Sequence, residues 1–466
     1  MSPRRVAVLG GGISGLAAAQ RCRDIARERG IDLEITVLER SERAGGCIET
    51  RVREGVVAEL GPDSIVTEKP AALDLARRLN LGDEIAPMRP EYRGARIVRG
   101  GRLLPIPDDF RLFAPTTIAG MVRSGLFGPV GVVRAALEPF IPARRGGGDE
   151  SVASFVTRRF GREVLDRLAQ PLIGGIYSGD PRRLSMQATL PMMLMLERKY
   201  GSMVRGIRAA ARAQPQAQPL QRLVSLRGGL GSMIAALERE LGASIRTSSA
   251  VESLRYRADD GRSPSWRIAL AGGEVVEADA VVCALPAPAA ASLIGASDEN
   301  LARLLRSIAY HSVVTVTLAY ETRRLPELPR CTGFVVPFSE GRSIMSTTIS
   351  TQKFAGRAPD GVTLLRAYAG GALQPHLAQM DDAALFAVVR GELRALLGIA
   401  ADPAWTVIRR WQNALPEYAV GHADLVDTIE REAARLPGFA LAGSAYRGVG
   451  IADCVRSGEE AAAHVV

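Results

Sequence analysis

The first forty residues place a glycine-rich turn between two short apolar runs. Residues 6–9 form the first run, the turn follows at once, and apolar positions at helical spacing then continue to residue 26. Residues 33–38 form the second run, which ends at Glu39. This order of strand, glycine turn, helix, strand and acid is the full context that the dinucleotide-binding fingerprint requires. The turn consists of Gly10, Gly11, Gly12, Ile13, Ser14 and Gly15.

The glycines of this turn and the acid each have a physical role in such a unit. Gly10 lets the strand turn sharply, Gly12 lets the backbone approach a pyrophosphate, and Gly15 lets the helix pack closely on the sheet. The helix N-terminus offers unpaired N–H groups and about half a positive charge to the phosphates. Glu39 can accept hydrogen bonds from a ribose diol and repels a 2′-phosphate, which argues against NADP. The unit does not separate FAD from NAD, and a glycine turn without a ligand is the structural alternative.

Two further turns follow the acid. Arg43 stands just before Gly45 and Gly46, where its guanidinium can pair with a phosphate or with a flavin edge. A predicted strand over residues 55–60 leads into a second glycine-containing turn, which can bring backbone against a flat ring. Taken alone, each turn is also compatible with an ordinary connection between two elements.

Together these segments resemble the flavin amine oxidase superfamily. The fingerprint, the E-x-x-x-R-x-G-G run and the G-P-D-S turn are most similar to those of the porphyrinogen oxidases, namely protoporphyrinogen oxidase and the bacterial coproporphyrinogen III oxidase. The resemblance covers essentially the whole chain and implies one non-covalent FAD. Besides the first turn, it assigns FAD contacts to Glu39, Arg40, Arg43, Gly45, Gly46, Gly61, Pro62, Asp63 and Ser64.

The C-terminal part carries the other half of the resemblance. Trp411 lies in a segment similar to the family's R-W-x-x-x-x-P run beside the flavin, although without the resemblance a core tryptophan is the simpler interpretation. Val251 matches a position that packs on the adenine in the family, and alone it is only a strand valine. Residues 448–454 open the last helix, whose N-terminus can stabilise negative charge on the reduced flavin. The contacts expected there are Val449, Gly450 and Ile451.

The resemblance also implies residues around a macrocycle. A segment around Gly175 is similar to the family's G-[VI]-Y-[AS]-G-D-P run, where a backbone carbonyl faces the pyrrole N–H groups; a plain turn between helices is the alternative. Val335 and Phe354 would line the pocket by the same analogy, and both are also ordinary core residues. Animal and plant protoporphyrinogen oxidases carry an arginine where this chain has Ala95, which weakens the assignment to that substrate. Arg96, one residue on, is a candidate for a substrate carboxylate or a solvated strand arginine.

We expect an α/β chain with a Rossmann-like FAD-binding domain of the amine oxidase type, a β-sheet substrate domain and a helical domain. A chain of 466 residues is too long for one core. The FAD-binding domain is expected over 1–92, 220–300 and 406–466, the helical domain over 93–207, and the substrate sheet over 301–405. Smaller features expected are a hairpin over 93–107, two short helices within 112–142, a linker over 144–148, a turn over 172–181 and an exposed loop over 209–219.

Composition excludes several classes. The net charge is +9, and only three of the 59 basic residues are lysines. Aromatic residues make up 5% of the chain and the arginines are dispersed, which argues against nucleic-acid binding, although a basic surface can attract anionic lipid or a polycarboxylate. Five cysteines without a CxxC pair argue against a structural zinc site and against a disulfide framework, so no metal is expected.

The sequence predicts neither a signal peptide nor a transmembrane helix, because the fingerprint begins at Gly10 and the longest apolar stretch is broken by prolines. A cytoplasmic location follows as the expectation. The helices within 112–142 mix apolar and basic residues, so interfacial membrane contact at the inner membrane face and packing within the helical domain are both open.

The family's reaction removes six electrons from a porphyrinogen in haem biosynthesis, with flavin N5 as hydride acceptor and O2 reoxidising the flavin to hydrogen peroxide. The resemblance favours coproporphyrinogen III as substrate, with protoporphyrinogen IX as the alternative. It also suggests ferrochelatase or other haem-pathway enzymes as partners. We assign no residue as catalytic acid or base, because oxidation of a C–H beside an N–H can proceed with little help from side chains.

Other flavoprotein functions remain alternatives. Amine oxidases often place a lysine opposite flavin N5 on the strand equivalent to 308–320, where this chain has none. Monoamine oxidases tether the flavin through a cysteine near the last motif, and residues 443–446 contain none. Phytoene-type desaturases share both ends of the chain but not the segment around Gly175. A catalytically silent flavoprotein is the remaining class.

Overall fold

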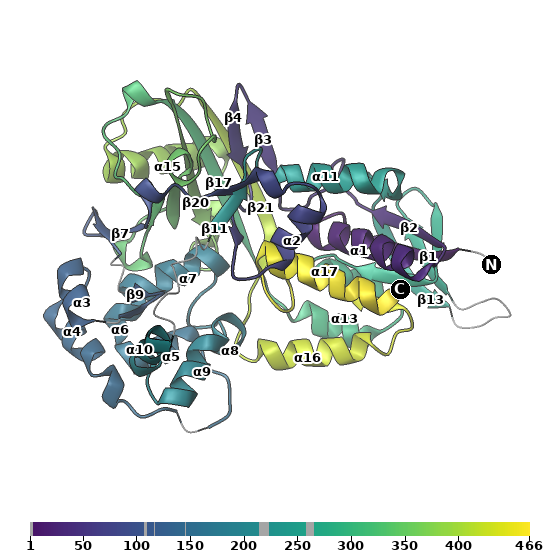
Figure 1. Ribbon diagram of the computed structural model, residues 1–466, viewed down its shortest axis with the longest axis horizontal. Coiled ribbons are helices and arrows are strands. Elements are labelled where there is room, and N and C mark those ends of the chain that lie inside the picture. Colours follow the sequence, from purple (N-terminus) through teal and green to yellow (C-terminus); the bar gives the residue numbers. More distant parts are fainter. Residues whose placement is uncertain (1–2, 107–109, 116, 145, 214–222, 258–264) are drawn as a thin grey trace.

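The computed structural model describes residues 3–106, 110–115, 117–144, 146–213, 223–257 and 265–466. The expectations for Pro107, Arg145 and residues 214–219 lie outside these residues. Figure 1 shows three regions: a sheet with helices on both faces, a second large sheet, and a group of helices below it.

A five-stranded parallel sheet carries the glycine-rich turn. Its strand order is β12-β2-β1-β16-β22, with every neighbouring pair parallel. The central strand β1 is buried over its last four residues, as expected of a strand covered on both faces. The strands come from the start, middle and end of the chain: β1 (Arg4–Leu9), β2 (Leu33–Leu38), β12 (Ile245–Arg246), β16 (Ala280–Cys283) and β22 (Phe439–Leu441).

Two apolar cores sandwich this sheet, which confirms the expected α/β Rossmann-like architecture. One face is covered by α1 (Ile13–Arg29), α2 (Ala71–Arg78), α11 (Gly231–Leu241) and α17 (Ile451–Val465). The other face is covered by the strands β13 (Val251–Arg257), β14 (Ser265–Leu270) and β15 (Val275–Ala278), and by the helices α12 (Ala287–Ile294), α13 (Glu299–Arg306) and α16 (His422–Ala433). Smaller sheets beside it are β3 (Thr50–Arg53) with β4 (Val56–Glu59), and β5 (Ile65–Val66) with β11 (Leu223–Leu226) and β6 (Ile85–Pro87).

A seven-stranded sheet forms the second region. Its order is β21 (Trp405–Pro416), β17 (Tyr310–Glu321), β20 (Val362–Gly370), β19 (Ser346–Ile349), β18 (Gly333–Val335), β7 (Arg96–Arg99) and β8 (Arg102–Pro105). The alternation over 308–320 is the long strand β17, and the hairpin within 93–107 is β7–β8. Helix α15 (Asp382–Leu397) packs on one face, and the short helix α14 (Ser350–Lys353) follows β19. The opposite face meets the β3–β4 hairpin and the helical region.

Short helices form the third region, around a core of their own. They are α3 (Ile118–Ser124), α4 (Pro129–Ala136), α5 (Val152–Phe160), α6 (Arg162–Val164), α7 (Gln170–Tyr177), α8 (Met186–Thr189), α9 (Pro191–Tyr200) and α10 (Met203–Ala213), with the strands β9 (Phe110–Arg111) and β10 (Ala114–Pro115). The remaining single turns are 3-10 helices η1 (Gly82–Glu84), η2 (Pro90–Tyr92), η3 (Glu138–Phe140), η5 (Gly242–Ser244), η6 (Thr322–Arg324), η7 (Phe338–Glu340) and η8 (Pro375–Gln379), and a π-helical turn η4 (Leu165–Ala169).

Two expectations for this region are wrong. The turn expected over 172–181 begins as the later part of helix α7, which has a proline as its second residue and ends at Tyr177, with Ser178 as a left-handed C-cap. The loop expected from residue 209 is helical as far as Ala213, because alanine and arginine both favour helix. The two short helices expected within 112–142 are α3 and α4. Among the described residues, no helix has the length and apolar character needed to span a bilayer.

Candidate cofactor and substrate site

In the first glycine turn, some glycines are required by the packing of the fold, and another is required only if a ligand binds. Gly10 has φ +99°, and a Cβ on Gly15 would lie 2.0 Å from the Gly10 carbonyl oxygen, so α1 can pack here only with glycine. A Cβ on Gly12 would meet nothing closer than the Gly46 Cα, at 4.0 Å. The protein therefore does not need glycine at position 12 for packing. The open space there is what the close approach of a pyrophosphate requires.

Glu39 fixes the turn from the end of β2. Its Oε2 accepts a hydrogen bond from the Gly11 N–H and its Oε1 accepts one from the Ser41 N–H, both at 2.8 Å. The side chain is buried, and each carboxylate oxygen keeps a second lone pair for a ribose hydroxyl. Its neighbour Arg40 is exposed at the rim. Val251, at the start of β13, is partly buried against the core beneath the sheet.

The segment 43–46 lies directly against the first turn. The Gly45 N–H donates to the Gly11 carbonyl at 2.7 Å, and Gly46, with φ +56°, lies beside Gly12. Arg43 does not have the free guanidinium that the sequence suggested. Its donors go to the carbonyls of its own loop and to a carboxylate, namely Ala44 O, Gly46 O, Ile48 O and Glu49 Oε2. Arg43 therefore shapes the loop, and the structure does not support a direct pairing with a phosphate.

The turn of Gly61, Pro62, Asp63 and Ser64 continues this line of contacts. A Cβ on Gly61 would lie 1.8 Å from the Cys47 carbonyl oxygen, so the two turns touch through backbone. Trp411 on β21 donates its indole N–H to the Leu60 carbonyl at 2.8 Å, and Arg366 on β20 donates to the Gly61 carbonyl at 2.7 Å. The polar contact of Trp411 is thus to the backbone of this turn, and its place beside the flavin stays a prediction.

Asp63 is held by two buried cations. Lys353 Nζ and Arg366 Nη2 each lie 2.8 Å from one of its carboxylate oxygens. Burial alone would raise the pKa of Asp63, but the charges of Lys353 and Arg366 outweigh it and hold that pKa well below its usual range. Asp63 is thus a fixed anion facing protein cations. Its role in this structure is to hold the turn.

The second helix N-terminus opens beside the first. Because β1 and β22 are parallel strands of one sheet, the helices α1 and α17 that follow them start at the same edge. A Cβ on Gly458 would lie 2.1 Å from Ser14 O, so the two helices pack with their backbones in contact. Gly450 is the N-cap of α17, preceded by Val449 and followed by the buried Ile451. The two helix starts that the sequence pointed to are therefore neighbours.

Polar contacts fix the second helix N-terminus. The Tyr418 hydroxyl accepts a hydrogen bond from the Gly448 N–H and donates one to Ser444 O, both at 2.7 Å. Asp453, in the first turn of α17, accepts two hydrogen bonds from Lys69 Nζ, at 2.7 and 2.8 Å, and Arg456 Nη2 lies 3.8 Å from its Oδ1. These groups hold the loop before α17 in one position, which an anion at this helix N-terminus needs.

Of the predicted substrate residues, Gly175 has the most open surroundings. It lies exposed in the last turn of α7, and a Cβ on it would meet no atom within 4 Å. No described residue donates a hydrogen bond to its carbonyl oxygen, which belongs to the unsatisfied C-terminal end of a helix. A carbonyl in this state is able to accept hydrogen bonds from a ligand.

Val335 and Arg96 lie on opposite faces of the seven-stranded sheet. Val335 and its register partner Ile97 pack toward the helical region, whereas Val98 belongs to the core under α15. Side chains alternate along a strand, so Arg96 shares the face of Val98. Its Nη1 donates to the Leu103 carbonyl at 3.3 Å. The structure does not support the expectation that Arg96 reaches a substrate on the side of Val335.

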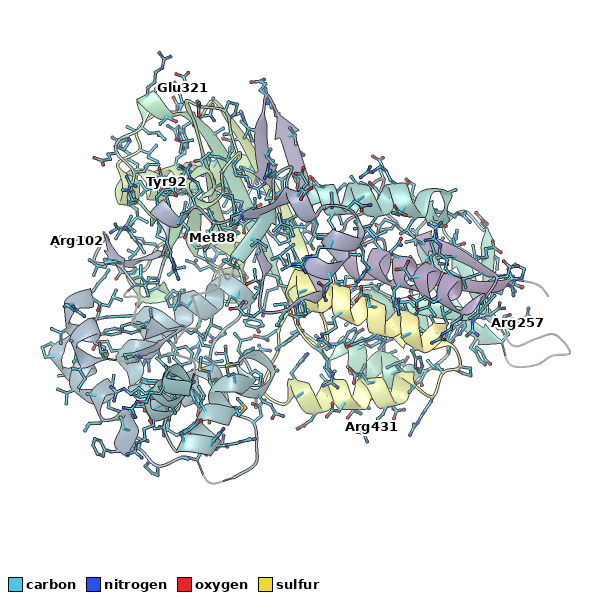
Figure 2. All side chains as sticks on the ribbon, in the orientation of Figure 1. Met88, Tyr92, Arg102, Arg257, Glu321 and Arg431 are labelled. Atoms are coloured by element: carbon cyan, nitrogen blue, oxygen red, sulfur yellow. The ribbon has the colours of Figure 1, made fainter. Side chains whose placement is uncertain are left out.

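Phe354 is enclosed by protein. Only 2% of it is exposed, its backbone forms an isolated bridge with Met88, and the cations of Lys353 and Arg357 lie 5.4 and 5.3 Å from its ring centroid. Met88 lies near the middle of the molecule in Figure 2. The core alternative for Phe354 therefore describes its surroundings better than the pocket-lining role.

Sequence reasoning missed Lys353 itself. The lysine of amine oxidases was expected on the strand over 308–320, whereas Lys353 comes from α14, which follows β19, two strands from β17 in the same sheet. Its Nζ donates to Asp63 Oδ1 and to Ser64 Oγ, both at 2.8 Å. One signal was present: the chain has only three lysines, so a lysine next to a predicted pocket residue was worth attention.

Comparison with known proteins agrees with this geometry. The model of the protein family described as "Flavin containing amine oxidoreductase" matches residues 13–466 of this chain. The chain belongs to the flavin-containing amine oxidoreductase family. The residues of the cradle fit its cofactor, because the open space over Gly12 at the α1 N-terminus suits the pyrophosphate of FAD, and the α17 N-terminus at the same edge of the sheet suits negative charge on the flavin. The chain is thus an FAD-dependent oxidoreductase of this family.

Full-length relatives place the chain further within the family. Coproporphyrinogen III oxidase of Bacillus subtilis is 30% identical over 98% of this chain and 97% of its own length. The enzyme of the same name from Propionibacterium freudenreichii is 32% identical over 98% of this chain and 90% of its own. A crystal structure from Exiguobacterium sp. 255-15, provisionally named a protoporphyrinogen oxidase, matches with a TM-score of 0.88 at 32% identity, covering 100% of this chain and 99% of that one.

Proposed function

We propose that this protein oxidises a porphyrinogen to a porphyrin, with coproporphyrinogen III as the preferred substrate and coproporphyrin III as the product. Six electrons and six hydrogens leave the substrate, and three molecules of O2 become three of hydrogen peroxide. FAD, when bound, supplies the hydride acceptor and is reoxidised by O2. The observation that carries the proposal is the similarity, over almost the whole chain, to two enzymes named for that substrate.

The chain's own groups support this chemistry by binding and orientation. The cradle of Gly12, Gly46 and the α17 N-terminus fixes the cofactor non-covalently, since residues 443–446 offer no cysteine for a tether. The free carbonyl of Gly175 is an acceptor for pyrrole N–H groups, and it needs no side chain. Apolar positions such as Val335 suit the ring. We assign no residue as a catalytic acid or base.

The substrate preference rests on carboxylates. Coproporphyrinogen III carries four and protoporphyrinogen IX two. By the family resemblance, Ala95 occupies the position at which animal and plant protoporphyrinogen oxidases carry an arginine. The neighbouring Arg96 donates its hydrogen bond to the Leu103 carbonyl. A two-carboxylate substrate therefore lacks its usual cation. Protoporphyrinogen IX oxidation remains the second candidate, favoured by the match to the Exiguobacterium structure.

Turnover of both porphyrinogens side by side, followed by porphyrin fluorescence and by hydrogen peroxide formation, tests the proposal. We expect kcat/KM to be at least tenfold higher for coproporphyrinogen III. A higher value for protoporphyrinogen IX would reverse the substrate assignment. Turnover of neither substrate by FAD-loaded protein would contradict the function itself. Gly175→Ala tests whether the backbone carbonyl alone is needed at this position. The added Cβ meets no protein atom within 4 Å and leaves the carbonyl in place, so we expect most of the activity to remain.

A peripheral membrane contact at the inner membrane face of a cytoplasmic protein is the localisation that we propose. Large apolar side chains are exposed along α3, α4 and the turn after α4, which is a suitable surface for lipid contact. They are Ile118, Val122, Val130, Val133, Leu137 and Phe140. In a flotation experiment with anionic vesicles, the parent protein should float with the vesicles, and the Val130→Asp, Phe140→Asp double variant should stay behind in the dense fraction. Ferrochelatase or another haem-pathway enzyme is the proposed protein partner, as consumer of the product.

A further inference from the structure

Five charged side chains form one buried network behind the turn over 61–64. Lys353 and Arg366 both bind Asp63, Arg366 also donates to the Glu59 carbonyl at 2.8 Å, and Arg357 Nη1 lies 3.6 Å from Glu59 Oε1. Each of these side chains is at most 14% exposed. We call this set the charge network: Glu59, Asp63, Lys353, Arg357 and Arg366.

The charge network contains more cations than anions. Three cations face two carboxylates, so one positive charge is left over among the described groups. Burial raises the pKa of Glu59, which can only increase this excess. An unbalanced buried charge is costly, and proteins normally pair such charges. The excess therefore indicates that an anion from outside the network completes it.

Lys353 is the member best suited to meet that anion. An ammonium has three N–H donors, and the described residues take two of them, at Asp63 and Ser64. Arg366 and Arg357 lie deeper, each 2% exposed, and they donate to the carbonyls of the turn and to Ser225 Oγ. Among the described residues, Arg366 Nε and Arg357 Nη1 find no hydrogen-bond partner, but both are too deeply buried to meet a bound molecule first. Lys353 is also the network member nearest to solvent apart from Asp63, at 12% exposure.

The place of this network within the cradle suggests which anion it meets. The contacts run from Gly12 to Gly46, from Cys47 to Gly61, and from the same turn to Lys353. The contact between Gly12 and Gly46 lies at the predicted pyrophosphate site. The contact between the 61–64 turn and Lys353 lies at the other end of the cradle, toward the seven-stranded sheet. A flavin ring bound at that end gains negative charge when it is reduced.

We propose that Lys353 is a positioning and electrostatic residue of the flavin site: it holds the Asp63–Ser64 turn and uses the excess charge of the network to stabilise the reduced, anionic cofactor. The inference rests on the proposed function only in requiring that FAD be reduced during turnover. Burial lowers the pKa of Lys353, and the carboxylate of Asp63 opposes that shift.

The test compares reduction potentials of the bound FAD in the wild-type holoenzyme and in the variants Lys353→Met, Lys353→Arg and Lys199→Met. Lys199 is exposed on α9 and provides the matched control. We expect Lys353→Met to weaken reduction at least tenfold in equilibrium constant, a potential about 30 mV lower for a two-electron couple. Lys353→Arg should recover most of the difference, and Lys199→Met should not move the potential.

A second variant covers the case in which Lys353→Met fails to retain FAD. Asp63→Asn removes an anion from the network, so it should raise the potential instead. An unchanged potential in FAD-loaded Lys353→Met would overturn the inference, and so would an unchanged or lowered potential in Asp63→Asn. Chemical reduction supplies the electrons in these titrations. Failure to oxidise any porphyrinogen would therefore contradict the proposed function and leave this result intact.

Discussion

Gly458 of α17 lies so close to Ser14 of α1 that a Cβ on the glycine would come within 2.1 Å of the serine carbonyl oxygen. This contact joins the last helix of the chain to the first. It sets how far α17 lies from the first turn of α1, and so it makes the relative position of the two helix N-termini a property of helix packing.

Gly458→Ala should therefore damage both stability and cofactor binding. The backbone of α1 cannot give way as a flexible side chain would, so we expect a loss of about 1–3 kcal/mol in the free energy of unfolding. We also expect a lower content of FAD per chain. Gly391→Ala is the matched control: it lies in α15, where a Cβ meets no atom within 4 Å, and it should stabilise by up to about 1 kcal/mol. Equal stability of the two variants would contradict the packing argument.

Gly12→Ala should separate folding from binding. Its Cβ has room in the protein, and the backbone at φ −72° suits alanine, so the apoprotein should unfold within about 0.5 kcal/mol of the parent. FAD affinity should fall at least tenfold, because the methyl group occupies the space of the pyrophosphate. Gly15→Ala is the contrast: its Cβ would lie 2.0 Å from Gly10 O, so this variant should fail to fold. Unchanged FAD affinity in Gly12→Ala would place the pyrophosphate elsewhere.

The helical region should depend on one buried ion pair. Arg159 and Glu138 are fully buried and bonded to each other, and Glu138 also accepts hydrogen bonds from the Ser202 hydroxyl and the Met203 N–H. Removing one partner leaves an uncompensated charge, so Arg159→Met should cost about 3–5 kcal/mol of unfolding free energy. Arg162→Met removes an exposed pair with Asp166 and should cost less than about 1 kcal/mol. Thermal melts of the two variants make the comparison, and similar losses would show that burial is not the cause.

Acid should destabilise the protein partly through Asp63. Its pKa is lowered in the folded state, because the charges of Lys353 and Arg366 outweigh its burial. A lowered carboxyl pKa contributes stability above the unfolded value of about 3.9 and loses it as the pH falls through the folded value. The stability difference between parent and Asp63→Asn should thus be constant from pH 7 to about pH 5 and shrink below about pH 4. Denaturant melts across this range measure it, and a difference independent of pH would contradict the assignment.

Local patterns predicted most of the fold because the spacing of apolar residues in most segments matches the period of the helix or strand that the segment forms. The glycine unit at residues 10–15 and the alternation that became β17 are strong because a turn or a pleated strand accepts few other sequences. The segment around Gly175 was expected to be a turn because glycines favour turns. It is the end of helix α7, where tertiary packing outweighs propensity.

Side-chain roles were less predictable, because they depend on contacts between distant segments. Arg43 was expected to pair with a phosphate or with a flavin edge, but its guanidinium donates to carbonyls of its own loop. The face of Arg96 follows from strand register, which one residue of misalignment inverts. Lys353 meets Asp63 only because α14 follows β19, two strands from β17, and no spacing in the sequence shows that neighbourhood.

Anaerobic mixing of the purified, FAD-loaded protein with coproporphyrinogen III tests the central claim most directly. The account predicts that the yellow flavin absorbance bleaches within the mixing experiment, that porphyrin appears only as far as the bound FAD can accept electrons, and that admitting air restores the yellow colour with further porphyrin. Protein that binds FAD and stays yellow with excess porphyrinogen would contradict it.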